Sequence, residues 1–273
     1  MEYKIVASDL DGTLLNSQGR VSEENWRAIE EMGKRGVHFV PATGRAFQEM
    51  PEELLESSLI RYYITSDGTS VYDKKTDTTH ELAMPRALTN RVLDKLYQYP
   101  FCMMVHADTR SYVDAKTHNE ADYKRCNMDR EWIDFSFAME EVLPDLKTFT
   151  YEHESIQSLV PFFEDLADLR ECQAYFERDP ELIVAQSYPY NLEIFSSKAG
   201  KGNALMLLAD ILGVDHAATI AVGDSTNDYT MVKDAGLGLA MENAVPELKA
   251  VADEVICHHD EHSAKYILEH YIK

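Results

Sequence analysis

The chain has 273 residues, of which 45% are apolar and 27% charged, a balance typical of one or two globular domains and not of a disordered chain. It carries 48 Asp and Glu against 26 Lys and Arg, which gives a formal net charge of −22. A chain this acidic lacks the basic surface that binds nucleic acid or an anionic membrane, so we expect neither as a partner.

The sequence contains no recognisable export or membrane segment. No apolar run approaches the roughly 18 residues of a membrane span. The N-terminal MEYKIVASDL lacks the basic start and apolar core of a signal peptide. The four cysteines, at 102, 126, 172 and 257, form no CxxC pair, which argues against a zinc site and a disulfide framework. We therefore expect a cytoplasmic protein with reduced thiols.

Short apolar runs alternate with amphipathic segments at the N-terminal end of the chain. Runs of strand length lie at 3–10, 37–42 and 62–65. A helix is predicted from a capping serine at 22 to 34, and a second helical stretch ends at Glu56. The three strands are followed at once by the polar turns DGT, TGR and SDG. Alternating strands and helices with short connections predict parallel βαβ units.

The same alternation returns at the C-terminal end. Helices are predicted at 201–212 and 264–272, and strands at 219–222, 237–241 and 254–257. The first of these strands again ends in a polar turn, GDSTND. This part of the chain therefore completes the core that the N-terminal part begins.

The middle of the chain follows a different pattern. Helices and strands are mixed there, with helices predicted at 90–97 and 158–166 and strands at 101–106 and 111–114. None of these strands ends in an Asp-Gly or Thr-Gly turn. We predict an α/β fold in which 1–84 and 190–273 form a Rossmann-like parallel-sheet core, and 85–189 form an inserted α+β domain.

Two carboxylates follow the first predicted strand in the motif DLDGT. Ligands of open α/β sheets bind beyond the carboxyl ends of the strands, where Asp9 and Asp11 fall. One carboxylate of such a pair can attack phosphorus, and the other can give a proton to the leaving oxygen and then take one from water. A lone DxDG is also common as an acidic surface turn. It is not a calcium loop, because Leu14 and Arg20 stand where such a loop needs Gly and Glu.

A second acidic turn contains Asp224 and Asp228 on either side of Asn227. Carboxylate and amide oxygens suit Mg²⁺, which would offset the repulsion between an acidic site and an anionic phosphoryl group. Most DxxxD pairs are solvated helix faces, so the pair alone is weak evidence for a metal site. Neither a GxSxG nucleophile elbow at Ser225 nor a complete GxxxxGK[ST] phosphate loop at 200–202 is present.

Three further residues stand at sites suited to a phosphate. Thr43 and Gly44 end the second predicted strand and offer a hydroxyl and backbone N–H groups. Lys201 begins a predicted helix, so its ammonium and the helix N-terminus are both available to an anion. Each alone is typical of a turn or a surface lysine, but the order DxDGT, TG, K and GDxxND is improbable by chance.

This ordered set resembles the haloacid dehalogenase-like hydrolases, and among them the Cof-type (subfamily IIB) phosphatases. The motifs are DLDGT, ATGR, KGNAL and GDSTNDYTM, followed by GLGLAMENA, and the resemblance covers the whole chain. It implies that Asp9 is the nucleophile and Asp11 the general acid and base. It also implies that 85–189 form a cap domain that selects the substrate.

The resemblance further implies a Mg²⁺ site and a phosphate site. The metal ligands are Asp9, the backbone carbonyl of Asp11 and Asp224, with Asp228 supporting the metal shell. The implied phosphate-binding groups are the Leu10 backbone, Thr43, Gly44, Lys201 and Asn227. Arg45, in the ATGR motif, is a candidate substrate contact.

Two segments depart from the family pattern. SDGT at 66–69 stands where relatives usually carry SNGA, which places an additional acid, Asp67, beside the site. HHDEHSAKY stands where relatives often carry an acidic-Gly-Val turn. His258 and His262 are four apart, a spacing that binds a transition metal on a helix, but no further ligand follows and we expect a polar surface segment.

The sequence thus predicts a Mg²⁺-dependent phosphatase that hydrolyses small phosphomonoesters through an aspartyl-phosphate. Sugar phosphates are the first expected substrate class, with pyridoxal phosphate and flavin mononucleotide also implied by the family. Two alternatives use the same residues. A phosphosugar mutase would return the phosphoryl group to a sugar, and a non-catalytic sensor would bind the phosphate compound without turnover.

Overall fold

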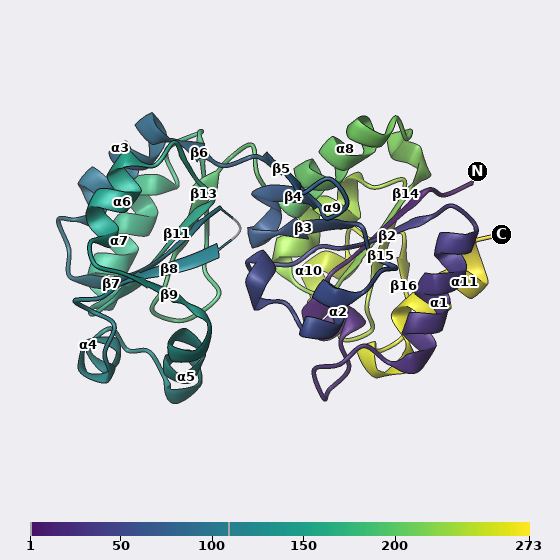
Figure 1. Ribbon diagram of the computed structural model, residues 1–273, viewed down its shortest axis with the longest axis horizontal. Helices are drawn as coiled ribbons and strands as arrows, with labels where there is room; N and C mark the ends of the chain where they lie inside the picture. The colour runs from purple at the N-terminus through teal and green to yellow at the C-terminus, as the bar shows by residue number, and fades with distance from the viewer. Residues whose placement is uncertain (1, 109) are drawn as a thin grey trace. The chain divides into compact units, whose positions relative to one another are not determined.

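The computed structural model describes residues 2–108 and 110–273. The chain forms two compact units (Figure 1). The first comprises the chain up to Arg45, Met50–His80 and Gly200–Lys273, and the second comprises Ala46–Glu49 and Glu81–Ala199. Over the described ranges, no helix combines the length and the apolar character needed to cross a bilayer.

A five-stranded parallel sheet forms the centre of the first unit, with the order β16-β15-β14-β1-β2. Its strands are β1 (Ile5–Ser8), β2 (His38–Pro41), β14 (Thr219–Gly223), β15 (Leu237–Ala240) and β16 (Glu254–Val255). β1 and β14 read IVAS and TIAVG and are buried along their whole length, as expected for parallel strands covered by helices. Because all the pairings are parallel, the carboxyl ends of the strands lie at one edge.

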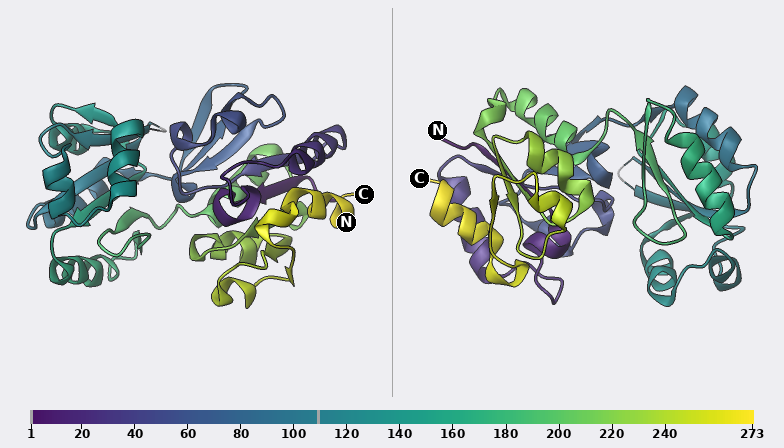
Figure 2. Two further views of the ribbon diagram at one scale, coloured as in Figure 1. Left: turned by 90° about the horizontal axis from the view of Figure 1, so that it is seen from below. Right: turned by 180° about the vertical axis from the view of Figure 1, so that it is seen from behind.

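Helices connect and cover these strands. They are α1 (Glu23–Lys34), α2 (Glu52–Glu56), α8 (Lys201–Leu212), α9 (Tyr229–Asp234), α10 (Pro246–Lys249) and α11 (Ser263–Tyr271). α1 begins where the Ser22 side chain accepts a hydrogen bond from the N–H of Asn25. α8 ends at Gly213, whose φ of +64° favours glycine. In Figures 1 and 2, α1 lies beside α11 and α8 lies beside α9.

A small antiparallel sheet follows β2 in the chain. It consists of β3 (Tyr62–Thr65), β4 (Ser70–Asp73) and β5 (Thr78–Glu81). A parallel bridge between Ala42 and Ile64 brings the start of this sheet beside the end of β2. The tight turn η3 (Ser66–Gly68) between β3 and β4 therefore lies near the carboxyl edge of the parallel sheet.

The second unit is built on a mixed six-stranded sheet with the order β12-β13-β11-β7-β8-β9. Its strands are β7 (Phe101–Ala107), β8 (Arg110–Asp114), β9 (Glu141–Leu143), β11 (Ser158–Phe163), β12 (Leu182–Ala185) and β13 (Glu193–Ser196). β6 (Met84–Pro85) and β10 (Ser155–Ile156) form a separate antiparallel pair. The helices are α3 (Arg86–Leu96), α4 (Glu120–Arg125), α5 (Arg130–Met139), α6 (Leu146–Glu152) and α7 (Leu166–Phe176).

The two faces of this sheet pack into separate hydrophobic clusters. Alternate residues of β7 divide between them: Met103 and Val105 join residues of α3 and α7, while Cys102 and Met104 join residues of α4 and α5. The Sγ atoms of Cys102 and Cys126, 24 residues apart in the sequence, lie 2.9 Å apart in the second cluster. Both thiols are free and buried.

The structure confirms the predicted fold class, a parallel α/β core with an inserted α+β segment. One predicted element is wrong: 158–166 is not a helix but contains β11, and α7 begins only at Leu166. β11 reads SLVPFF and is buried at every position, because it lies inside the sheet with neighbours on both sides. A short, continuously apolar run shows no alternation, so its periodicity cannot distinguish a strand from a buried helix.

The boundaries between the units differ from those expected at 84/85 and 189/190. The chain passes between the units at 80/81 and 199/200, and Ala46–Glu49 groups with the second unit. β13 lies beyond the expected boundary, but its hydrogen bonds are to β12 and β11. A strand belongs to the sheet that pairs it, and this pairing was not visible in the sequence.

Close packing of the first unit predicts opposite effects for two glycine-to-alanine substitutions. A Cβ at Gly238, in β15, would lie 1.9 Å from the backbone oxygen of Val232, whereas a Cβ at Gly33, in α1, would meet nothing within 4 Å. We expect Gly238→Ala to lower the free energy of unfolding by about 3 kcal/mol. The control Gly33→Ala should raise it by about 0.5–1 kcal/mol. Urea denaturation measures both, and equal effects would contradict this packing.

Candidate active site

The candidate catalytic residues lie at the carboxyl edge of the parallel sheet. Asp9 follows β1, and the next residues form the tight helical turn η1 (Leu10–Leu14). Asp224 follows β14, and η5 (Thr226–Asp228) comes directly after it. Gly12 allows the two turns to meet, since it has a φ of +76° and a Cβ there would lie 2.4 Å from Asp224 Oδ2. The sequence therefore brings two distant acidic motifs together through neighbouring strands.

Lys201 is the cation of this cluster. Its side chain is fully buried, and its Nζ donates hydrogen bonds to Asp9 Oδ1 (2.6 Å) and Asp228 Oδ1 (2.7 Å). α8 begins at Lys201, and its start lies close to η3, since a Cβ at Gly68 would be 2.3 Å from the backbone of Gly200. This close approach fixes where the long lysine side chain enters the acidic cluster.

Burial and like charge raise the pKa values of Asp9 and Asp224. Burial, and then the neighbouring Asp228, raise the pKa of Asp9 well above its ordinary value, and Lys201 opposes this shift. The same two causes raise the pKa of Asp224 to about 6. Burial tends to lower the pKa of Lys201, but Asp228 and Asp9 outweigh it and raise that pKa, so the lysine stays charged. The site therefore carries more negative charge than its one buried ammonium balances.

The donor set fits a hard divalent cation. Carboxylate oxygens of Asp9, Asp224 and Asp228 lie within 4.8 Å of one another. Asp224 Oδ1 is buried and has no hydrogen-bond partner within the described part of the chain, which is the state of an atom available to a metal. Oxygen-only donors of this kind match Mg²⁺. A bound cation would also neutralise the negative charge that Lys201 alone does not balance.

Asp228 has a different environment from the other two acids. Its Oδ1 accepts from Lys201, and its Oδ2 accepts from the backbone N–H groups of Asp224 and Ser225, both at 3.0 Å. A Cβ at Gly223 would lie 2.3 Å from the Asp228 side chain, so a larger residue could not stand there. Asp228 thus orients the Asp224 loop and adds negative charge beside it.

Asn243 holds Asp224 from the other side, and no role was assigned to it from the sequence. Its Nδ2 donates to the backbone oxygen of Gly12 (2.8 Å) and to Asp224 Oδ2 (3.3 Å). Its Oδ1 accepts the backbone N–H of His259 (3.2 Å). The segment MENA that contains it was noticed as a motif, but only the fold reveals what its asparagine contacts.

Asp11 points away from the buried cluster. Its side chain is 58% exposed and accepts two hydrogen bonds from the Arg45 guanidinium, from Nε at 2.9 Å and from an Nη at 2.7 Å. The acidic group of three that lies within metal-binding distance does not include its carboxylate. Arg45, expected to contact substrate, is thus paired with the expected general acid.

The residues expected to bind phosphate surround η3. Thr43 is buried and its Oγ1 accepts the N–H of Arg45, while the backbone N–H of Asp67 donates to the Thr43 carbonyl. Asp67 Oδ1 accepts from Asn227 Nδ2 (2.9 Å), and Asp67 Oδ2 would lie 3.1 Å from a Cβ at Gly44. Asp67, the additional acid of the SDGT segment, therefore accepts the hydrogen bond of Asn227, a residue expected to bind phosphate. The Leu10 side chain is fully buried, so only the backbone of Leu10 could contact a phosphate.

The second unit contains a buried polar cluster that sequence reasoning missed. His106 Nδ1 lies 2.9 Å from Ser158 Oγ, and His106 Nε2 lies 4.0 Å from Glu49 Oε1. Glu140 accepts a hydrogen bond from Ser136, and burial raises its pKa to about 8. The only sign in the sequence was a histidine and a serine within otherwise apolar strands.

Comparison with known proteins gives the family. A model of the haloacid dehalogenase-like hydrolases matches residues 6–268. The chain belongs to this family. A Bacillus subtilis protein, phosphatase YwpJ, is 29% identical over 98% of this chain and 99% of its own length. Another from the same organism, 5-amino-6-(5-phospho-D-ribitylamino)uracil phosphatase YwtE, is 29% identical over 97% of each chain.

Solved structures agree with this assignment. A haloacid dehalogenase-like hydrolase from B. subtilis superposes with a TM-score of 0.80 at 26% identity and covers 98% of this chain and 100% of its own. A Thermotoga maritima structure superposes with a TM-score of 0.81 at 24% identity, over 99% and 98%, and shares the fold. Within the haloacid dehalogenase-like hydrolases this chain is a Cof-type phosphatase.

The raised carboxyl pKa values predict how the stability of the metal-free hydrolase depends on pH. The pKa of Asp224 is about 6 in the folded chain against an ordinary 3.8, so the folded state binds this proton more tightly than the unfolded state does. The protonated Asp224 carboxyl therefore contributes to the free energy of unfolding below about pH 4, and this contribution is lost as the pH rises through about 6. We therefore expect Asp224→Asn to be more stable than wild type in EDTA, by a margin that grows with pH.

Urea denaturation from about pH 4 to about pH 7, which covers the interval between the ordinary pKa of 3.8 and the folded-state pKa of about 6, measures this margin. Asp234→Asn, at the exposed end of α9, is the matched control and should show no such growth. A margin that stays constant with pH would mean that Asp224 is not destabilised by its own charge.

Proposed function

We propose that the protein hydrolyses small phosphomonoesters through an aspartyl-phosphate formed on Asp9, with Mg²⁺ as cofactor. The observation that carries this proposal is the buried Lys201 ammonium, which is hydrogen-bonded to Asp9 while Asp224 and Asp228 lie within metal-binding distance. A nucleophilic carboxylate that contacts a buried ammonium and lies among metal ligands is the arrangement that phosphoryl transfer to a carboxylate requires.

Asp9, Asp224 and the backbone carbonyl of Asp11 would hold Mg²⁺, and Asp228 would keep Asp224 in place through its loop N–H groups. When bound, the metal supplies positive charge that screens the carboxylates from the phosphoryl group and stabilises the charge on its oxygens. The buried Asp224 Oδ1 supports its part as a ligand. Lys201 supplies the second cation, which is hydrogen-bonded to Asp9 and Asp228.

In the first half-reaction, a carboxylate oxygen of Asp9 forms a bond to phosphorus as the bond from phosphorus to the ester oxygen breaks. Asp11 gives its proton to the departing oxygen. In the second half-reaction, Asp11 takes a proton from water, whose oxygen attacks phosphorus and frees Asp9 and inorganic phosphate. Thr43, Gly44, Asn227 and the Leu10 backbone would position the phosphoryl oxygens through these steps.

Arg45 links substrate binding to this proton transfer. The Asp11 carboxylate accepts hydrogen bonds from Nε and Nη2 of Arg45, so the pair must open before Asp11 carries a proton to the ester oxygen. Opening would release the guanidinium from Asp11, and a guanidinium is suited to a phosphate or a polar leaving group. This accounts for a substrate-contacting arginine that is paired with an acid here.

We propose sugar phosphates and related polyol phosphates as the substrate class, with the second unit as the domain that selects the leaving group. The phosphatase YwtE, a relative, is named for a substrate that carries a phosphoribityl chain. The free, buried thiols of Cys102 and Cys126 support a reducing, cytoplasmic setting.

Replacement of the nucleophile tests the mechanism. We expect Asp9→Asn to lower phosphate release from every phosphomonoester by roughly 10³-fold or more, because an amide oxygen cannot form the phosphoryl intermediate. EDTA should abolish turnover in wild type, and added Mg²⁺ should restore it. A panel of phosphomonoesters and a phosphate-release assay measure both effects. Turnover that persists in folded Asp9→Asn would overturn the aspartyl-phosphate mechanism.

Removal of the additional acid should strengthen phosphate binding. Asp67 accepts the hydrogen bond of Asn227 and repels a phosphate dianion, so Asp67→Asn should lower KM and the inhibition constant of inorganic phosphate by roughly threefold to tenfold. Asn tolerates the φ of +53° at this position. Asp77→Asn is a matched control, since Asp77 also has a positive φ (+54°) and lies in the β4–β5 turn. An unchanged KM in Asp67→Asn would exclude Asp67 from the phosphate site.

A further inference from the structure

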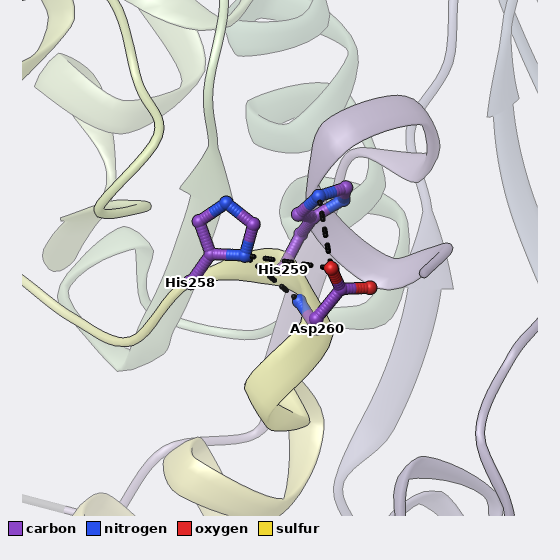
Figure 3. Close-up of side chains that lie close together, drawn as sticks. All are labelled: His258, His259 and Asp260. Carbon is purple, nitrogen blue, oxygen red and sulfur yellow. Dashed lines mark hydrogen bonds and ion pairs between the residues drawn. The ribbon is translucent and has the colours of Figure 1, made fainter. Parts of the chain in front are cut away.

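The segment after β16 brings two imidazoles and a carboxylate together. One ligand atom from each of His258, His259 and Asp260 lies within 4.8 Å of the others. Figure 3 shows both rings directed toward the same carboxylate oxygen of Asp260. His258 Nδ1 lies 3.8 Å and His259 Nε2 lies 3.7 Å from Asp260 Oδ2. This cluster belongs to none of the motifs that form the candidate active site.

The tautomer of the neutral His259 ring is set by a backbone contact. Its Nδ1 lies 3.1 Å from the carbonyl oxygen of Leu15. A carbonyl can only accept, so Nδ1 carries a proton, and in the neutral ring the lone pair is on Nε2, which lies 3.5 Å from Ser17 Oγ. Histidine ligands of metals commonly donate their other ring N–H to a carbonyl or carboxylate, which orients the ring. His259 already has that outer contact.

His258 offers a second lone pair on the same side. Its Nδ1 accepts the backbone N–H of Asp260 at 3.3 Å, which means that Nδ1 is unprotonated. At this length the hydrogen bond is weak, so little is lost when the nitrogen turns to another partner. Both nitrogens that face Asp260 are therefore available as ligands.

Asp260 is held in place by Ser17, which follows η1 in the chain. Its Oδ1 accepts the backbone N–H of Ser17 (2.8 Å), and its Oδ2 accepts the Ser17 hydroxyl (2.7 Å). Each carboxylate oxygen has a further lone pair. Tetrahedral ligands about 2.0–2.2 Å from zinc lie roughly 3.3–3.5 Å from one another. The observed separations of 3.7 and 3.8 Å exceed that by only a few tenths of an ångström.

We propose that His258, His259 and Asp260 bind a divalent transition metal, with Zn²⁺ as the ion that the donor set fits best. Two imidazole nitrogens and one carboxylate oxygen favour Zn²⁺ over the Mg²⁺ of the all-oxygen site. The cluster is partly exposed, which leaves a coordination position for water. This site is independent of the proposed phosphatase mechanism.

Occupancy would join two segments that flank the catalytic residues. Leu15 and Ser17 follow η1, and His259 holds Asn243, which in turn contacts Asp224. A metal bound by the histidines and Asp260 therefore fixes the chain after the DLDGT motif to the chain after β16. We expect Zn²⁺ to raise the melting temperature of the intact protein.

Calorimetric titration with Zn²⁺ tests the site in the full chain. The titration uses saturating Mg²⁺ and the Asp9→Asn background, so that Zn²⁺ does not compete for the acidic site. We expect one Zn²⁺ per chain. Zinc-edge X-ray absorption should show imidazole nitrogen in the shell. Absence of Zn²⁺ binding, or a shell of oxygen alone, would overturn the proposal.

Three substitutions by asparagine identify the ligands. His258→Asn keeps an acceptor for the Asp260 N–H, and His259→Asn keeps a donor for the Leu15 carbonyl, so each retains its structural contact while it removes the imidazole. Each should weaken Zn²⁺ binding at least tenfold. His262→Asn is the control, because Asn tolerates the φ of +68° there. Equal weakening in His262→Asn, or none in the first two variants, would overturn the ligand set.

Discussion

One buried ammonium group determines the arrangement of the catalytic edge. Lys201 is fully buried and donates to Asp9 and Asp228, which follow different strands. A buried charge is stable only when its partners are present, and the cost of removing one partner is several kcal/mol. The ends of β1 and β14 and the start of α8 therefore hold one another in position. The close approach of Gly68 to Gly200 adds η3 to the same assembly, and the hydrogen bond from the Asp67 N–H to the Thr43 carbonyl connects Thr43 to it.

This arrangement also explains how a chain with a net charge of −22 can hold an anion. Net charge acts over long distances and is screened by salt, whereas Lys201 and a metal held by Asp9 and Asp224 act at contact distance. Asp67 opposes them at the edge of the same site. Affinity for phosphate is thus a balance among a few charges that lie close together, and the acidic surface contributes little to it.

Much of the core and its site was predictable because strand ends carry the chemistry. A buried apolar run followed by DLDGT or GDSTND fixes both an element and the edge at which its acids lie, so the fold class could be predicted from patterns alone. β11 was not predictable in the same way, since a strand covered on both faces shows no alternation. The pairing of Arg45 with Asp11 and the contacts of Asn243 depend on distances between remote segments, which no local pattern records.

The strand order has a consequence for how the protein forms during synthesis. β1 pairs with β14, whose residues leave the ribosome more than 200 positions later, since Ile5 is opposite Thr219. At about 5–20 residues per second, the N-terminal strands wait about 10–40 s for this partner. The second unit lies almost wholly within 81–199 and is available in full before the first unit can close. The inserted domain is therefore finished while its host is still incomplete, and β1 and β2 depend on chaperones or on each other in the interval.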